Sequence, residues 1–559
     1  MHWCLRTLIR LTLVTLSTSS VLIGTAHAAQ PPAAGAAASR SDAAGRGAAG
    51  AAPTTAAKPQ PKFAISEFIV LGDHLLPPEV VERAVYPFLG PQRDLKTVQM
   101  AVTALEQAYR RAGYGTVFVD IPQQDVTNGV VRLQITEGTI ERVQVHGERY
   151  FSGRAIRAAL PALRVGHTPN LPALQQQLGA LNSYTPDRLV TPVLKAGSEP
   201  GTVDVDLAVK DTLPLHGFVQ YDDRHTADTT PDRVTGSLSY DNLWQRQDTL
   251  GITYQTAPAD VRNAEVWVAN YLAHVGAGIA AFSYIRTSSN VLALGTLGVL
   301  GQGSIYGAHW QQTLTNTVAE TQGLDAGVDY KDVDTEVFTG ATATAGAGTV
   351  TAPVKYLNWS LVYTQSWRHA QSAFGYSAGA AFGIRSLINS TDQFENARYN
   401  ARADYIDLRV SMNAAQNLPA GFSVRERMSS QWSPNPLVNN EQYSLGGEDT
   451  VRGYLEAEAL GDSGVAGTFE VHSPAPLPAK LPVLAPVYGY LFADGGVASV
   501  QDPLHGQIAM TSLWSYGAGL RLDTARGFAG YFELAVPGAN GVRTRRGHAA
   551  EEFMVRYAF

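Results

Sequence analysis

The spacing of apolar residues changes along this 559-residue chain. Between residues 63 and 210, segments with helical spacing are mixed with short segments in which every second residue is apolar. From Thr212 to the last residue, helical spacing disappears and two-residue alternation takes over. The pattern therefore predicts an α+β region followed by a long region built of strands.

The α+β region begins with a small module over residues 63–138. Its clearest element is a helix over Leu95–Arg111, in which apolar residues are spaced four, three and four apart at Val98, Val102, Leu105 and Tyr109. A strand over 63–71 and a short helix opening at Pro78 precede this helix, and two strands at 117–121 and 131–135 follow it. The predicted order is β-α-α-β-β.

Residues 139–211 repeat that order. The predicted elements are a strand at 143–145, helices at 151–160 and 171–181, and paired strands at 189–194 and 203–209. We interpret the region as two tandem copies of one small fold.

The rest of the chain, residues 212–559, predicts a β-barrel. Alternating segments include Val234–Tyr240, Thr249–Tyr254, Glu265–Leu272, Trp359–Tyr363, Tyr405–Met412 and Phe422–Met428. The chain ends on alternating apolar residues, the last of which is Phe559. Beyond the first 28 residues the sequence has no apolar run of about 18 residues, so a membrane would have to be crossed by strands of a closed barrel.

Composition agrees with a barrel. Charged residues make up 16% of the chain, against about 25% in an average soluble protein. The 53 glycines and 24 tyrosines are typical of many short strands joined by tight turns and bounded by aromatic belts.

The N-terminal residues 1–28 have the features of a secretory signal peptide. Arg6 and Arg10 precede an apolar run over Leu11–Ile23, and we expect cleavage after Ala28. Cleavage would remove Cys4, the single cysteine, and would exclude disulfides and a cysteine nucleophile from the mature chain. Loss of the two arginines changes the formal charge from -7 to -9, which argues against nucleic acid as a partner.

Residues 29–62, rich in Ala, Gly and Pro, are predicted to be a disordered linker.

One irregular stretch carries the candidate chemistry. Residues 445–454, Leu-Gly-Gly-Glu-Asp-Thr-Val-Arg-Gly-Tyr, combine glycines with charges in a segment too irregular for a strand. The five N–H donors of Arg452 favour a buried carboxylate. Asp494, in the otherwise apolar run Phe492-Ala493-Asp494-Gly495, is the candidate partner.

These motifs resemble those of a known family. Val451-Arg452-Gly453-Tyr454 and Phe492-x-Asp494-Gly495 resemble the signature of the Omp85 superfamily, and the whole chain resembles its two-partner secretion branch, the haemolysin secretion and activation type of outer-membrane transporter. The segment from Gly113-Tyr114 through Pro122-Gln123-Gln124 to Glu137-Gly138 is similar to the first of the two POTRA domains of these transporters.

The resemblance implies a mainly β fold and a site. We expect a transmembrane barrel of about sixteen antiparallel strands over residues 212–559, preceded by two periplasmic α+β POTRA domains at 63–138 and 139–211. It also implies that Arg452 lies at the tip of a loop around 433–464 that folds into the lumen and is locked to Asp494, with Phe492 and Gly495 as the supporting motif. Counting strands back from Phe559 places that loop on the extracellular side.

The implied function is export across the outer membrane of a Gram-negative bacterium. The POTRA domains would recognise an unfolded exoprotein, adhesin-like or haemolysin-like, with an N-terminal secretion domain, and the barrel would pass it to the surface. An incoming strand could pair with a POTRA sheet edge, and the predicted strand at 203–209 and the helix at 171–181 are candidates for that contact. Outer-membrane lipids, and insertion machinery acting at the C-terminal strand, are the other implied partners. No cofactor is implied.

Three alternatives stay open at this point. An outer-membrane assembly factor of the same superfamily would usually have more POTRA modules, and a porin would need none. A serine hydrolase is suggested by Gly375-Tyr376-Ser377-Ala378-Gly379, but that motif needs a strand, a sharp turn and a helix, whereas its flanks here predict strands. The thirteen histidines show no metal-binding spacing. We therefore predict no catalytic residue and no metal site.

Overall fold

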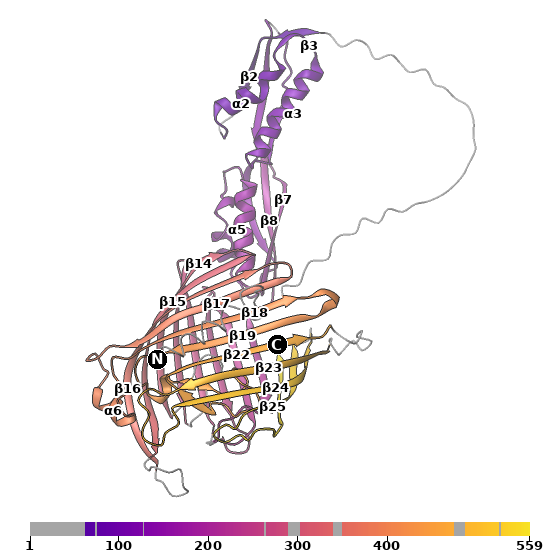
Figure 1. The fold of residues 1–559 in the computed structure, drawn as a ribbon. Coiled ribbons are helices and arrows are strands. Elements are labelled where there is room, and N and C mark those ends of the chain that lie inside the picture. The colour runs from indigo at the N-terminus through magenta and orange to yellow at the C-terminus, as the bar shows by residue number, and fades with distance from the viewer. Residues whose placement is uncertain are drawn as a thin grey trace, which may run out of the picture. The chain divides into compact units, whose positions relative to one another are not determined.

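The computed structural model describes residues 62–72, 75–126, 128–227, 229–261, 264–288, 302–338, 349–474, 487–524 and 527–559. The predicted signal peptide lies outside the described residues, as does the predicted linker apart from Lys62. The chain divides into two compact units between Pro214 and Leu215 (Figure 1). No helix in the described ranges has the length and hydrophobicity needed to cross a membrane.

The N-terminal unit begins with a module built on a three-stranded sheet of order β2-β5-β4. Its elements are β1 (Phe63–Ile65), β2 (Glu67–Leu71), α2 (Pro78–Val85), η1 (Tyr86–Phe88), β3 (Gly90–Arg93), α3 (Leu95–Arg111), β4 (Val117–Asp120) and β5 (Val130–Glu137). Helix α3 has the predicted bounds, and its Leu105 and Tyr109 are fully buried in one core with Leu133 of the central strand. The predicted strand at 63–71 is two strands, because β1 pairs with β3 whereas β2 joins the sheet.

The second module has the same sheet arrangement, with order β6-β8-β7 and its own core. Its elements are β6 (Thr139–His146), α4 (Gly153–Ala158), η2 (Pro161–Leu163), α5 (Leu171–Ser183), β7 (Arg188–Ala196) and β8 (Thr202–Asp211). Strand β8 pairs with β6 on one side and with β7 on the other. The prediction that the strand at 203–209 could accept an added strand is therefore wrong, because both of its edges are already occupied.

Side-chain hydrogen bonds connect the β7–β8 hairpin to β6 through Glu141. The Glu141 carboxylate on β6 accepts hydrogen bonds from the Ser198 hydroxyl and, at 2.7 Å, from the Thr202 hydroxyl. These two hydroxyls, with the Ser198 backbone N–H, lower the pKa of Glu141 to about 2. Glu141 is therefore ionised throughout the physiological pH range, and the hairpin keeps this anchor.

Asn170 joins the two modules. Its Oδ1 accepts a hydrogen bond from Ala173 N at 3.1 Å and caps α5, while its Nδ2 donates to Ala112 O of the first module at 3.1 Å. The next residue, Leu171, donates its N–H to Gly113 O at 2.9 Å. Gly113 has a φ of +97°, and a Cβ there would lie 2.8 Å from Asn170 Nδ2, so this junction requires glycine.

The C-terminal unit is a closed antiparallel barrel of sixteen strands, which confirms the predicted fold class (Figure 1). Its strands are β9 (Leu215–Asp222), β10 (Arg233–Leu243), β11 (Asp248–Thr256), β12 (Val266–Val275), β13 (Gly278–Thr287), β14 (Gln302–Asn316), β15 (Glu320–Phe338), β16 (Thr349–Arg368), β17 (Ser372–Gly383), β18 (Ile406–Asn417), β19 (Ser423–Trp432), β22 (Ser463–His472), β23 (Val487–Ser499), β24 (Met510–Asp523), β25 (Phe528–Pro537) and β26 (Ala550–Ala558). The last strand, β26, pairs with the first, β9, and backbone hydrogen bonds between Phe559 and Gly217 extend that pairing.

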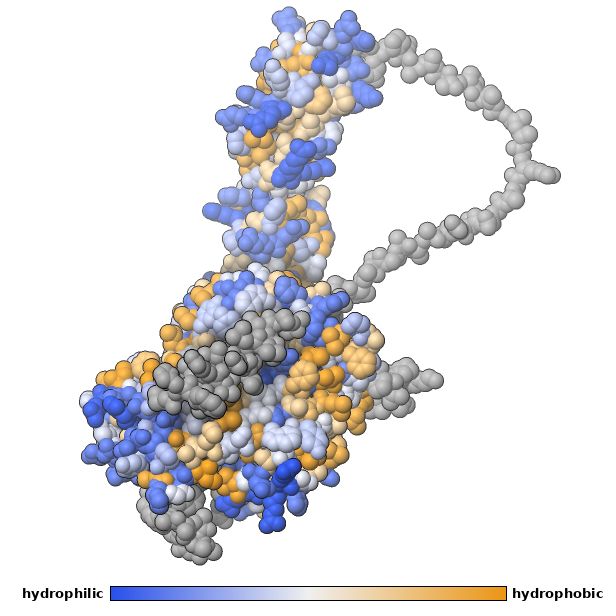
Figure 2. All heavy atoms as spheres, viewed as in Figure 1, coloured by the Kyte–Doolittle hydropathy of each residue, from blue (hydrophilic) through white to orange (hydrophobic). Residues whose placement is uncertain are grey.

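Alternation sorts the side chains of each strand between the two faces of the barrel wall. On β24, Trp514, Tyr516 and Leu520 are exposed on the outer face, whereas Leu513 and Ser515 are buried on the inner face. Apolar residues accordingly gather in patches on the barrel surface (Figure 2). An apolar exterior with a polar interior is the pattern of a membrane barrel.

Replacing Asn170 with Ala should loosen the junction between the modules as well as destabilise α5. Loss of the cap should cost about 1 kcal/mol of unfolding free energy. Asp94→Ala is the matched control, because Asp94 caps α3 through Thr97 N at 2.9 Å within one module. Both variants should lower stability in chemical denaturation, but Asn170→Ala should also broaden the spin-label distance distribution between the modules. Equal distributions in the two variants would contradict a tie at Asn170.

Candidate functional site

The connection between β19 and β22, residues 433–462, is a long loop with structure of its own. It contains η5 (Asn439–Glu441) and a short hairpin of β20 (Tyr443–Leu445) and β21 (Ala459–Gly461). Side chains of this loop contact residues on the inner face of several barrel strands. We call residues 446–458, between the two hairpin strands, the loop tip.

Arg452 in the loop tip is bound to the barrel wall through Asp494 of β23. Arg452 Nε lies 2.7 Å from Asp494 Oδ2 and Arg452 Nη2 lies 2.8 Å from Asp494 Oδ1, which is a bidentate ion pair. The backbone N–H of Arg452 also donates to Asp494 Oδ2 at 3.1 Å. The Arg452 side chain is 1% exposed and that of Asp494 is 0% exposed. The two residues that the sequence singled out therefore form a fully buried pair.

Two further acids complete the surroundings of the guanidinium. Arg452 Nη1 lies 2.8 Å from Glu470 Oε1 of β22 and 3.3 Å from Glu533 Oε2 of β25. The guanidinium also lies over the Phe492 ring, 3.6 Å from its centroid. Phe492 and Asp494 are two residues apart on β23, so both point to the inner face.

Glu470 and Glu533 were not among the residues predicted from the sequence. His472 and the Tyr490 hydroxyl also bind these acids, His472 Nε2 lying 2.7 Å from Glu470 Oε2 and Tyr490 donating to Glu533. A local signal was available, because each acid follows an aromatic residue, Phe469 or Phe532, that is exposed on the outer face. An acid at the inward position of such a strand is a candidate partner for a buried cation.

The other residues of the Val451–Tyr454 motif hold the tip in shape. Val451 is fully buried in a small apolar cluster with Leu445 and Leu513. Gly453 has a φ of +83° and donates its N–H to Glu552 Oε1 of β26 at 2.5 Å. The Tyr454 hydroxyl donates to the carbonyl of Ala539 at 2.9 Å and accepts a hydrogen bond from Ala539 N at 3.1 Å.

Gly495, the last residue of the second motif, makes no comparable contact. A Cβ at Gly495 would lie 3.9 Å from Trp514 Cβ, which is ordinary packing distance. At the neighbouring Gly496, a Cβ would lie 2.5 Å from Leu445 Cδ1 of the loop hairpin. The glycine that the packed loop requires is therefore Gly496, which the sequence analysis did not identify.

A second cluster binds the loop through Glu441. Its Oε1 accepts hydrogen bonds from Lys331 Nζ of β15 and, at 2.7 Å, from the Tyr356 hydroxyl of β16. Its Oε2 lies 3.1 Å from Arg409 Nη2 of β18. The Glu441 side chain is 1% exposed, so this end of the loop is also anchored by a buried charge.

A third cluster lies at the base of the loop. Asp462 binds both Nη atoms of Arg398, which follows α6 (Thr391–Ala397). Asp462 also accepts hydrogen bonds from Leu437 N at 2.8 Å and from Gln501 N at 2.6 Å. Asp462 is fully buried, and it joins both limbs of the loop to two neighbouring connections.

The loop leaves part of the barrel interior open. A cavity of about 710 Å³ lies between loop residues 439–444 and inward-facing residues of β13 to β19. His309, on its wall, lies between two carboxylates, with Nδ1 2.7 Å from Asp325 and Nε2 3.2 Å from Asp329. Lys331 and Arg409 also line the cavity, so its wall carries charges of both signs.

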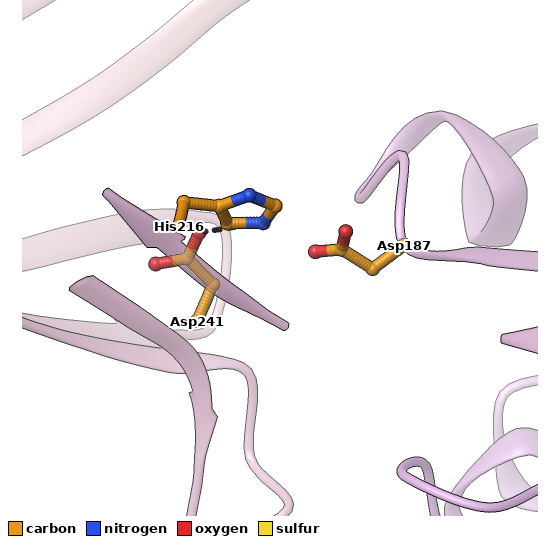
Figure 3. A group of neighbouring side chains, drawn as sticks. All are labelled: Asp187, His216 and Asp241. Atoms are coloured by element: carbon orange, nitrogen blue, oxygen red, sulfur yellow. Dashed lines mark ion pairs between the residues drawn. The ribbon is translucent and has the colours of Figure 1, made fainter. Parts of the chain in front are cut away.

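The serine of the hydrolase motif and one of the thirteen histidines, His216, lie on barrel strands. Ser377 lies in the middle of β17, where its hydroxyl is 2.7 Å from the Ser411 hydroxyl of β18, and no sharp turn to a helix follows it. His216 of β9 and Asp241 of β10 form a partly exposed ion pair of 3.6 Å (Figure 3). Asp187, also drawn there, belongs to the N-terminal unit, where it accepts a hydrogen bond from the Thr185 hydroxyl at 3.2 Å.

Together these contacts can fix a long loop against the inner wall of a barrel. Each anchor pairs a buried charge with opposite charges from strands or connections far away in the sequence.

Comparison with known proteins agrees with this architecture. Residues 201–522, more than half of the chain, match the profile of the family described as haemolysin secretion/activation protein ShlB/FhaC/HecB. Residues 63–138 match the POTRA domain of ShlB type.

Individual relatives are more distant. The chain is 25% identical over 451 residues to the outer membrane transporter CdiB of Dickeya dadantii (strain 3937), covering 78% of this chain and 75% of that protein. It is 23% identical over 502 residues to the outer membrane transporter CdiB of Escherichia coli, covering 87% and 80%.

Two solved structures share the fold. CdiB from Escherichia coli matches with a TM-score of 0.57 at 19% identity, covering 91% of this chain and 93% of that one. BamA from Haemophilus ducreyi lacking POTRA domains 1–3 matches with a TM-score of 0.54 at 12% identity, covering 89% and 100%. The family match confirms the resemblance seen in the sequence: the chain belongs to the ShlB/FhaC/HecB haemolysin secretion/activation family, the two-partner secretion branch of outer-membrane transporters in the Omp85 superfamily.

Proposed function

We propose that this outer-membrane transporter captures an unfolded exoprotein with POTRA domains at 63–138 and 139–211 and passes it through the barrel at 212–559. In this mechanism the loop around 433–464 obstructs the lumen at rest and moves when the exoprotein passes. The observation that carries the proposal is the burial of Arg452 against Asp494, which seats the loop on the inner wall.

The loop is held by buried ion pairs, and this kind of contact is consistent with the movement that we propose. An interface of buried ion pairs is costly to desolvate, so its net stability is small, although removing one partner leaves an uncompensated charge. Water entering the lumen can replace the partners of Arg452, Glu441 and Asp462 when the loop leaves. The strand ladders of the wall are hydrogen-bonded to one another and need not change.

The exoprotein that we propose is adhesin-like or haemolysin-like and carries an N-terminal secretion domain. Two further contacts belong to the proposal. Outer-membrane lipids would cover the exposed aromatic and aliphatic residues of the outer face, such as Trp514 and Leu520. Insertion machinery would bind the last strand, β26, before it closes on β9.

Strand β7 is the edge that we propose for capture. Within the described residues it pairs with β8 alone, and α5 lies beside it. The Asn182 side chain of α5 binds both backbone groups of Val190, with Nδ2 2.9 Å from Val190 O and Oδ1 2.8 Å from Val190 N. The backbone N–H and C=O of Val190 therefore point away from β8. By alternation, the free backbone groups of Pro192, Leu194 and Ala196 point the same way. The backbone of Leu194 and Ala196 is thus oriented to accept an extended segment.

Deleting residues 63–210 should abolish export of the exoprotein while the barrel still reaches the outer membrane. Heat-modifiable gel migration would show that the barrel folds, and the medium would be assayed for exoprotein. A porin would still conduct ions after this deletion, and a hydrolase would keep its activity. An assembly factor would show defects in unrelated outer-membrane proteins instead. Undiminished export by the deletion variant would contradict the proposed capture.

Arg452→Ala and Asp494→Ala should each impair export more than barrel assembly, and the double variant should be little worse than either one. Removing one partner of a buried pair typically costs about 3–5 kcal/mol, and two residues that act through one contact share one loss. Export, heat-modifiable migration and protease access near Glu448 on intact cells should be measured together. Losses that add, with equal protease access in all variants, would show that the two residues act separately.

Ala196→Pro should weaken binding of an unfolded secretion domain to purified residues 62–214. Proline removes an N–H that faces away from β8, so the sheet keeps its ladder but loses a donor for an added strand. Ala196→Ser keeps the N–H and is the matched control. Isothermal titration calorimetry would measure binding, and circular dichroism would show that both variants fold. Equal affinity of the two variants would exclude pairing at this part of β7.

A further inference from the structure

Arg224 makes a second attachment of the loop tip, separate from that of Arg452. It follows β9, the first barrel strand, and all three nitrogens of its guanidinium face acids of the loop tip. Nη1 lies 3.2 Å from Glu448 Oε2, Nη2 lies 2.7 Å from Asp449 Oδ2, and Nε lies 3.0 Å from Glu456 Oε1. No other segment supplies a carboxylate to this ion-pair group within the described residues.

The backbone takes part in the same attachment. Glu456 N donates to His225 O at 3.0 Å, and Thr226 forms a parallel β-bridge with Glu456. Thr226 and Glu456 are both buried. A Cβ at Gly447, which has a φ of +92°, would lie 2.3 Å from the Glu456 carboxylate. Glycine at that position is therefore what allows Glu456 to reach Arg224.

The two attachments hold different sides of the tip. Arg452 binds acids on β22, β23 and β25, whereas Arg224 belongs to the connection between β9 and β10. Strand β26 lies between these two sides of the barrel, and its Glu552 accepts the Gly453 N–H. The tip is thus fastened on both sides of β26.

The two attachments also differ in their access to water. The Arg224 side chain is 28% exposed and that of Asp449 is 47% exposed, against 1% for Arg452. Partly solvated ion pairs are weaker and are screened by salt. One guanidinium faces three acids here, and a second cation, Arg427, lies at its edge, with Nη1 3.7 Å from Asp449 Oδ1.

We propose that Arg224 is a second positioning residue for the loop tip, and that the tip must leave both Arg224 and Arg452 for an exoprotein to pass. The inference rests on the proposed function, since it assigns a second point of release to the same loop. Because the Arg224 attachment is the more solvated of the two, its ion pairs should be the more sensitive to salt.

A reversible disulfide tests the need for release. Thr226→Cys with Glu456→Cys places two thiols at bridged positions, and Cys4, the chain's one natural cysteine, precedes the predicted cleavage site. Under oxidation this double variant should lose at least tenfold in export, and a reductant should restore it. Glu456→Cys alone controls for the lost carboxylate. Ser237→Cys with Thr253→Cys, which are register partners on β10 and β11, controls for a disulfide that does not involve the loop.

Full export by the oxidised Thr226–Glu456 pair, with disulfide formation shown by thiol labelling, would overturn the inference. That result would leave the proposed function intact, because the unmodified chain would still export. Failure of the unmodified chain to export any exoprotein would instead contradict the proposed function.

Protease access tests whether Arg224 holds the loop tip, and this test needs no exoprotein. On intact cells, the double variant Arg224→Ala with Arg452→Ala should be cleaved near Glu448 at least tenfold faster than either single variant. Raising the salt concentration should speed cleavage of Arg452→Ala, because this variant keeps the Arg224 ion pairs and those are partly solvated. Heat-modifiable migration would show that each barrel is folded. A double variant cleaved no faster than Arg452→Ala would show that Arg224 does not hold the tip.

Discussion

A guanidinium that is removed from water needs compensating charge, and in this protein that need determines where the long loop lies. Arg452 is 1% exposed, and its bidentate partner Asp494 is entirely buried. An isolated charge in such surroundings would be strongly unfavourable, so the wall must present acids wherever the arginine reaches it. Asp494, Glu470 and Glu533 meet this requirement from three strands, each at a position where alternation turns the side chain inward.

The wall and the loop are held by different interactions. Sixteen strands form a continuous hydrogen-bonded cylinder, which leaves no strand edge open to lipid. The loop is attached largely through side-chain charges at Arg452, Glu441, Asp462 and Arg224. Charges that lose one another can be rehydrated in a water-filled lumen, whereas a broken strand ladder within a membrane cannot. The loop movement that we propose therefore does not require the barrel to open.

Much of the fold could be predicted because periodicity is a local property. Helix α3 has the bounds that its apolar spacing indicated, and the alternating apolar residues at the end of the chain form the last barrel strand, β26. Residue chemistry made Asp494 a candidate partner of Arg452, and the resemblance between motifs implied the pairing, since spacing alone does not bring residues 42 positions apart into contact. Long-range partners such as Lys331 and Glu441 had no local signal. Gly495 and Gly496 show that a motif can mark the wrong one of two neighbouring residues. Neighbours on a strand face opposite sides, and the motif marked Gly495, which faces away from the loop.

The central claim is that the loop is seated on the inner wall at rest and leaves it during export. Spin labels at Ala457→Cys in the loop tip and Gln371→Cys in the turn between β16 and β17 would measure the distance between loop and wall by pulsed electron paramagnetic resonance. With no exoprotein bound, the account predicts one narrow distance distribution. With an exoprotein stalled in the barrel, it predicts a second population at a different distance. An unchanged narrow distribution in the stalled complex would contradict the claim.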